Sequence, residues 1–213
     1  MAVLPKITIL ICRASLLLLV SSSLLLIDGL GQSRARSQRP HLRKPDVIFV
    51  PTPPETVEEM LRLAKIKKGD VLYDLGSGDG RIPIRAAQEY GIRAVGIDID
   101  PKMIDVAKEA AAQAGVSDKV RFRNEDLFQA DIRDATIVTL YLSNSLNLKL
   151  RPKLLRDLRP GTRIISHDFH MGDWPPEQTV RVPWLSLYRT VYVWTVPRHG
   201  RRSGKISVRG ASR

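Results

Sequence analysis

Between residues 45 and 196, short apolar runs alternate with stretches whose apolar residues recur every three or four positions. Short apolar runs that end in glycine or polar residues are typical of buried parallel strands, and the second spacing predicts amphipathic helices. We expect strands at 71–74, 94–98, 120–122, 136–142, 163–166, 180–182 and 188–196. We expect helices at 56–64, 81–90, 101–114 and 146–158.

Strands that alternate with helices form a parallel sheet with right-handed crossovers. The last two predicted strands follow each other without an intervening helix, so they should close the sheet as an antiparallel pair. The pattern therefore predicts one α/β domain at 45–196. Its fold class is a doubly wound, mostly parallel, Rossmann-like sheet of seven strands.

The amino-terminal residues 1–31 differ in character from the predicted domain. A hydrophobic run from Ala14 to Ile27 follows Lys6 and Arg13, and small residues precede Gln32. This arrangement predicts either a signal peptide or an uncleaved signal anchor, because the uncharged run is shorter than the ~20 residues of a typical membrane-spanning helix.

The formal net charge of +12 belongs to the two ends of the chain. We interpret 32–44 as a basic linker and 197–213 as a basic disordered tail, whereas 45–196 carries equal numbers of acidic and basic residues. The absence of net charge on residues 45–196 argues against nucleic acid as a partner. Basic residues are denser after the hydrophobic segment than before it, which favours a membrane-tethered enzyme with a cytoplasmic domain. Signal cleavage would instead give a secreted or periplasmic protein.

A glycine-rich turn follows the first strand, in the sequence Asp74-Leu-Gly76-Ser77-Gly78-Asp-Gly-Arg81. Glycines at this point let the backbone approach a ligand closely. Dinucleotide sites place a third glycine where this chain has Arg81. The carboxylate of Asp74 beside the turn suits a ligand with an ammonium and a sulfonium, which predicts S-adenosyl-L-methionine as the cofactor.

Acidic residues also follow the next two strands. Asp98 ends the second strand, where one carboxylate can accept hydrogen bonds from both ribose hydroxyls. Asp126 follows the third strand and can accept from an adenine amino group, while the backbone of Leu127 contacts the ring edge. Three acids along one edge of the sheet fall where open α/β sheets bind ligands.

These motifs, together with Val50-Pro51-Thr52-Pro53 upstream, resemble those of class I methyltransferases. The chain is most similar to the ATP synthase c-subunit lysine methyltransferase family and its bacterial relatives. The resemblance implies that Asp74, Gly76, Ser77 and Gly78 hold the methionine part of the cofactor, and that Thr52 helps to cover the site. It also implies a protein lysine as the leading acceptor, with a small molecule as the alternative.

The acceptor side should be built from residues that follow strands four and five. In-line methyl transfer needs positioning and a deprotonated acceptor, without a covalent intermediate. A base is needed only where the acceptor enters protonated, and Tyr141 or Trp174 could form an aromatic wall for a cation. The candidate catalytic residues are Tyr141, Asn144, His167 and Asp168.

Two classes of nucleic-acid methylation lack their motifs here. Cytosine C5 methylation needs a cysteine nucleophile, and the only cysteine is Cys12 in the predicted targeting segment. The Asn- or Asp-Pro-Pro-aromatic turn of amino-directed enzymes is replaced by Leu142-Ser-Asn-Ser145. No metal site is expected. The alternatives of another class are an NAD- or nucleotide-binding oxidoreductase and a non-catalytic cofactor-binding partner protein.

Overall fold

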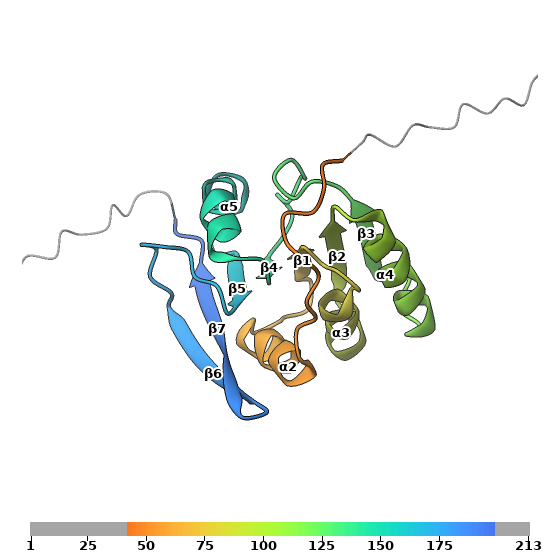
Figure 1. Ribbon diagram of the computed structural model, residues 1–213, viewed down its shortest axis with the longest axis horizontal. Helices are drawn as coiled ribbons and strands as arrows, with labels where there is room; N and C mark the ends of the chain where they lie inside the picture. The colour runs from red at the N-terminus through yellow and green to blue at the C-terminus, as the bar shows by residue number, and fades with distance from the viewer. Residues whose placement is uncertain (1–41, 199–213) are drawn as a thin grey trace, which may run out of the picture. The chain divides into compact units, whose positions relative to one another are not determined.

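The computed structural model describes residues 42–198, which form one mixed sheet with helices on both faces (Figure 1). The predicted segment 1–31 lies outside the described residues, as does almost all of both basic ends. In chain order the elements are α2 (Pro54–Leu63), β1 (Val71–Leu75), α3 (Arg81–Tyr90), β2 (Arg93–Asp98), α4 (Pro101–Gln113), β3 (Val120–Asn124), β4 (Ile137–Leu140), α5 (Asn144–Asp157), β5 (Arg163–His167), β6 (Gln178–Trp184) and β7 (Leu187–Thr195).

The sheet has seven strands in the order β3-β2-β1-β4-β5-β7-β6. The pairs from β3 to β5 are parallel, and β7 pairs antiparallel with both β5 and β6. The predicted fold class is confirmed. Because the chain winds outward from β1 to β3 and then returns to β4, the direction of winding reverses between β1 and β4. Ligands bind at such a point in doubly wound sheets.

Hydrophobic cores lie on both faces of the sheet. One contains the buried sides of α2 and α3, packed on residues such as Leu72, Ile165 and Val191. The other contains the leucines of α5, packed on Leu75, Ile164 and other strand residues. Layers on both faces explain why the central strands are apolar throughout, since neither side meets water. Within residues 42–198, no helix combines the length and apolarity needed to cross a bilayer.

Every predicted element is present, with ends that differ from the prediction by at most two residues. The differences around β4 bear on the site. The strand ends at Leu140, and α5 begins at Asn144 because the Ser143 side chain caps it, accepting a hydrogen bond from the Leu146 backbone N–H at 3.2 Å. Asn144 therefore belongs to a helix, and Tyr141 lies in the connection between strand and helix.

Candidate functional site

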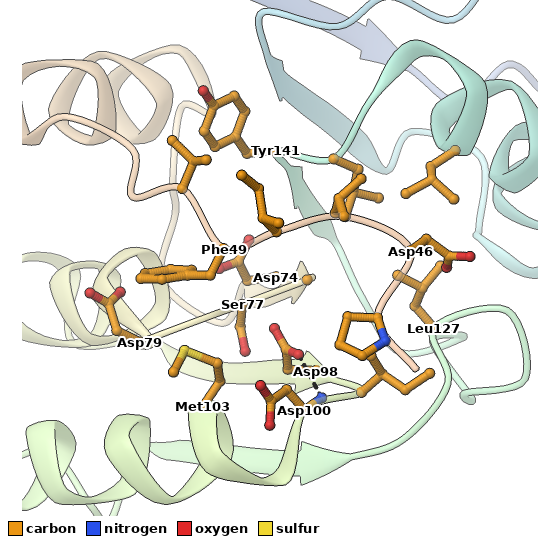
Figure 2. A pocket seen from close by; sticks show the side chains of 18 of the residues that line it. Asp46, Phe49, Asp74, Ser77, Asp79, Asp98, Asp100, Met103, Leu127 and Tyr141 are labelled. Carbon is orange, nitrogen blue, oxygen red and sulfur yellow. Dashed lines mark hydrogen bonds between the residues drawn. The ribbon is translucent and has the colours of Figure 1, made fainter. Parts of the chain in front are cut away.

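A pocket opens at the carboxyl ends of β1, β2 and β4, at the reversal of the strand order (Figure 2). It encloses about 120 Å³. Its wall includes most of the predicted cofactor residues, namely Thr52, Asp74, Gly76, Ser77, Asp98, Asp126 and Leu127. Gly78 adjoins the pocket through its backbone N–H, which donates to Asp98 Oδ2 at 2.8 Å.

The turn after β1 brings bare backbone to the pocket. The N–H groups of Gly76 and Ser77 both donate to the carbonyl of Ile97 in β2, at 2.8 and 3.0 Å. Gly78 has a φ of +50°, and a Cβ there would lie 2.3 Å from the Phe49 ring. The turn therefore has room for a ligand and for the covering segment only because this position carries no side chain.

Asp74 is the most deeply buried acid of the pocket. Only 3% of its surface is exposed, and the Thr139 hydroxyl donates to its Oδ1 at 2.7 Å. Burial raises the pKa of Asp74 to about 7; the Thr139 hydrogen bond opposes that rise, and the negative charges of Asp98 and Asp79 add to it. A buried carboxyl with a raised pKa is stabilised in its ionised form by an incoming cation.

Asp98 is fixed by backbone donors on both oxygens. Gly78 N–H contacts one oxygen, and Asp100 N–H contacts the other at 2.9 Å. Burial raises the pKa of Asp98, and the two backbone hydrogen bonds lower it by less. Each oxygen keeps a lone pair that can accept from a ligand hydroxyl.

Asp126 carries a partner that the sequence did not indicate. Arg43 Nε donates to Asp126 Oδ2 at 2.9 Å, and the Phe128 backbone N–H donates to Oδ1 at 2.9 Å. Burial opposes ionisation, but these contacts outweigh it and hold the pKa of Asp126 below its ordinary value. The ion pair joins the end of the predicted basic linker to the pocket across 83 positions of sequence.

The segment 43–52, which we call the strap, runs over the pocket before α2 begins (Figure 2). Phe49 sits above Gly78, and Arg81 Nη1 donates to the Thr52 carbonyl at 2.8 Å. The sequence motifs indicate only Thr52 as part of a cover. The apolar run Val47–Val50 before the Pro-Thr-Pro motif is the signal that could have indicated the whole covering segment. Ile48 at its centre is 85% exposed.

The acceptor side begins at Tyr141, which lines the pocket. Its ring stacks on His167 with centroids 3.8 Å apart. His167 is fully buried, and its Nδ1 lies 3.2 Å from Thr52 Oγ1. Burial lowers the pKa of His167 to about 4, with Asp168 opposing this shift and Arg189 adding to it. A buried imidazole with so low a pKa is neutral near pH 7 and is a poor proton acceptor.

Asp168 follows β5 with a φ of +58°, an uncommon value for a residue other than glycine. Its Oδ1 accepts from the Thr190 N–H at 2.7 Å, and its Oδ2 accepts from Arg189 Nη1 at 3.1 Å. Strained backbone held in place by several contacts is concentrated at functional sites.

Of the predicted acceptor-side residues, only Tyr141 belongs to the pocket wall. His167 stacks on Tyr141, and Asp168 Oδ2 lies 3.3 Å from His167 Nε2, whereas Asn144 and Trp174 make other contacts. Asn144 is exposed on α5, where its Oδ1 accepts from the His170 N–H at 3.1 Å, and it is not part of the pocket wall. The Trp174 ring packs against the Trp194 ring with centroids 6.1 Å apart, and Trp174 also lies outside that wall. The predicted aromatic wall therefore consists of Tyr141 alone.

The pocket fits the cofactor that the sequence predicts. Ser77 Oγ is buried and has no hydrogen-bond partner among residues 42–198, so it is available to a ligand. Asp74 provides a buried acceptor for a cation, and Asp98 provides two oriented oxygens. A ligand with an ammonium at one end and a ribose in the middle matches this order of groups.

Comparisons with known proteins also indicate a methyltransferase. Residues 74–178 match the family described as the ANTKMT methyltransferase domain. A protein-lysine N-methyltransferase of Saccharolobus islandicus is 38% identical over 156 residues, which cover 73% of this chain and 97% of that protein. The ATP synthase c-subunit lysine N-methyltransferase of Mus musculus is 34% identical over 140 residues, covering 66% of this chain and 56% of that protein.

A solved structure is more similar in sequence than either. It is an RNA methyltransferase from Salinibacter ruber in complex with S-adenosyl-L-homocysteine, with 56% identity and a TM-score of 0.66. The match covers 70% of this chain and 94% of that one.

The fold, the pocket and these relatives define a class I S-adenosylmethionine-dependent methyltransferase. The chain belongs to the family of the Saccharolobus islandicus protein-lysine N-methyltransferase, and its residues 74–178 match the ANTKMT methyltransferase domain. The predicted cofactor and enzyme class are confirmed, and this assignment replaces both the oxidoreductase alternative and the non-catalytic alternative.

Proposed function

We propose that the enzyme transfers a methyl group from S-adenosylmethionine to the ε-amino group of a protein lysine. The observation that carries this proposal is the 38% identity to a protein-lysine N-methyltransferase along 97% of that relative's length. The aromatic ring of Tyr141 in the pocket wall supports it, because an aromatic face can pack against the side chain of an incoming lysine.

On the cofactor side, we assign each acid to one part of the ligand. Asp74 pairs with the ammonium of the methionine part, and Asp98 accepts from the ribose hydroxyls. Asp126 accepts from the adenine amino group, and the backbone of Leu127 reads the ring edge. Thr52 closes the site as part of the strap. The bound cofactor supplies an electrophilic methyl group on its sulfonium.

On the acceptor side, the lysine must arrive as the neutral amine, because the protonated form has no lone pair for the methyl carbon. His167 is fully buried and lies outside the pocket wall, and burial lowers its pKa, so it is a poor base for the acceptor. We propose instead that the amine loses its proton to solvent on entering the desolvated site, since burial lowers the pKa of an amine. Tyr141 and Asp168 then orient the nitrogen.

Cofactor affinity is expected to fall as the pH drops below about 7. Asp74 has a pKa of about 7 in the free enzyme, and only its ionised form pairs with the ligand's ammonium. Binding at lower pH must therefore release a proton, and each pH unit weakens binding by up to about tenfold. Above pH 7 affinity declines again only when the ligand's α-amino group loses its proton.

Calorimetry with S-adenosyl-L-homocysteine, in buffers with different ionisation heats, measures both the affinity and the proton release. A dissociation constant that is the same on the acid side as at neutrality, with no buffer-dependent heat, would rule out this role for Asp74.

RNA is a second candidate acceptor, because the Salinibacter ruber protein with 56% identity is an RNA methyltransferase. The neutral charge of residues 45–196 favours lysine, since binding to nucleic acid relies on basic surface. The test is to incubate the full chain, methyl-labelled cofactor and a lysate of the source cells. We expect label in methyl-lysine after protein hydrolysis. Label confined to RNA or to a small molecule would refute the lysine acceptor.

We also propose that residues 1–31 tether the enzyme to a membrane with its domain facing the cytoplasm. The cofactor is made inside cells, and the basic residues after the hydrophobic segment favour this orientation. The mouse relative is named for a component of ATP synthase, which is compatible with an acceptor near a membrane. Protease added to intact and lysed cells tests the orientation. A soluble form that begins at Gln32 outside the membrane would refute it.

A further inference from the structure

Arg189 on β7 places a second charge next to the acceptor side. Its Nη1 donates to Asp168 Oδ2 at 3.1 Å, and its guanidinium lies 4.1 Å from the centre of the Trp184 ring. The side chains of Arg189 and Asp168 are only 25% and 22% exposed, so water screens this pair weakly. The buried Nε–H of Arg189 has no acceptor within residues 42–198.

The position of Asp168 does not depend on Arg189. The Asp168 N–H donates to the Thr190 carbonyl at 2.7 Å, and the Thr190 N–H donates back to Asp168 Oδ1 at 2.7 Å. These two contacts fix the turn after β5 through the backbone of β7. Arg189 contacts the remaining oxygen, which also lies 3.3 Å from Nε2 of the neutral His167. The distinct contribution of Arg189 is therefore a charge rather than the shape of the turn.

Four titratable groups meet here, and their charges sum to zero: Asp168 is negative, Arg189 is positive, and two rings are neutral. His167 is neutral because burial lowers its pKa to about 4, and Tyr141 is neutral because burial raises its already high pKa. The charges of Asp168 and Arg189 act on both rings with opposite signs. The acceptor side as a whole therefore has no net charge, and Asp74, on the cofactor side, is matched by the ligand's ammonium.

We propose that Arg189 sets the protonation state of the methyl acceptor by balancing the charge of Asp168, so that a primary amine enters the site as the neutral nucleophile. This inference rests on the proposed lysine acceptor. An uncompensated carboxylate beside an amine stabilises its ammonium form, which cannot react. With the pair intact, the ammonium gives one proton to solvent. The nitrogen then bonds to the methyl carbon as the sulfur–carbon bond breaks, leaving a methylated ammonium and S-adenosylhomocysteine.

The test compares Arg189→Gln with the wild-type full chain. Glutamine removes the charge but keeps much of the stem against Trp184 and a donor for Asp168. The measurement is the initial rate of methyl-lysine formation on heat-treated lysate protein at saturating cofactor, from neutral to alkaline pH. We expect the rate of the variant to rise with pH about one unit later than that of wild type. At neutral pH this shift appears as a rate roughly tenfold lower, recovered at alkaline pH.

Arg181 provides a matched control on the same hairpin. It stacks on Tyr188 at 4.3 Å, as Arg189 stacks on Trp184, but has no carboxylate partner among the described residues. Arg181→Gln should leave the pH profile unchanged, and Arg189→Lys, which keeps the charge, should restore it. An equal loss of rate at every pH in Arg189→Gln, or the same shift in Arg181→Gln, would overturn the proposal.

Product analysis keeps the two hypotheses separate. A wild-type enzyme that labels no lysine refutes the proposed acceptor, whatever the variants do. Wild-type lysine methylation with an unshifted Arg189→Gln profile refutes the role of Arg189 alone. Binding of S-adenosyl-L-homocysteine to each variant, with wild-type affinity expected, establishes that the cofactor side is intact.

Discussion

Asp74→Asn is expected to weaken cofactor binding by about two to four orders of magnitude. Asparagine keeps an oxygen for the Thr139 hydroxyl but cannot balance the ligand's ammonium in a fully buried position. Leaving a buried charge without its partner costs about 3–5 kcal/mol. Calorimetry with S-adenosyl-L-homocysteine measures the loss.

The variant should remain folded, because Asp74 already tends toward its neutral form in the free enzyme. Its pH dependence of binding on the acid side should also vanish. Asp105→Asn removes the same charge from an exposed position on α4 and should bind like wild type. Wild-type affinity in Asp74→Asn would mean that another group holds the ammonium.

Gly80→Ala is expected to lower the free energy of unfolding more than Asp74→Asn or Gly91→Ala. Gly80 precedes α3 with a φ of +79°, and a Cβ there would lie 2.5 Å from the Phe122 ring and 2.9 Å from the Ala107 side chain. The left-handed conformation costs an alanine roughly 1–2 kcal/mol, and overpacking adds about 1–3 kcal/mol. In a protein of this size each kcal/mol lowers the melting temperature by roughly 2–4 °C.

Gly91 at the other end of α3 isolates the two contributions. Its φ is +66°, but a Cβ there would meet nothing within 4 Å. Gly91→Ala should therefore lose only the roughly 1–2 kcal/mol of backbone strain. Thermal melts of the two variants measure the difference. Equal losses of stability in the two variants would show that the alanine Cβ at position 80 is not crowded by the side chains of β3 and α4.

Most of the cofactor side could be predicted because its signals are local. Asp74, Asp98 and Asp126 each end or follow a strand, and parallel strands bring their carboxyl ends to one edge of the sheet. The glycine-rich turn is continuous in sequence, so its spacing can be recognised without knowledge of the fold. The start of α5 was also readable in principle, since a serine just before the helix is a common cap.

The acceptor side was predicted less well because its contacts are distant in sequence. The sequence predicts Asn144 in the connection after the fourth strand, whereas the Ser143 cap puts it on the exposed start of a helix. His167 suggested a base from its chemistry, but its complete burial and low pKa depend on packing that no local pattern reports.

The sequence by itself determined the fold class, the cofactor and the acids that line the pocket, because strand order and turn chemistry follow from local periodicity. Only the tertiary structure decided which charges face one another. Arg43 reaches Asp126 across 83 positions, and Arg189 reaches Asp168 across 21 positions. The first pair depends on the path of the strap, and the second on the antiparallel register of β7 against β5. Neither leaves a periodic signal, because an ion pair between distant segments constrains only the two residues that form it.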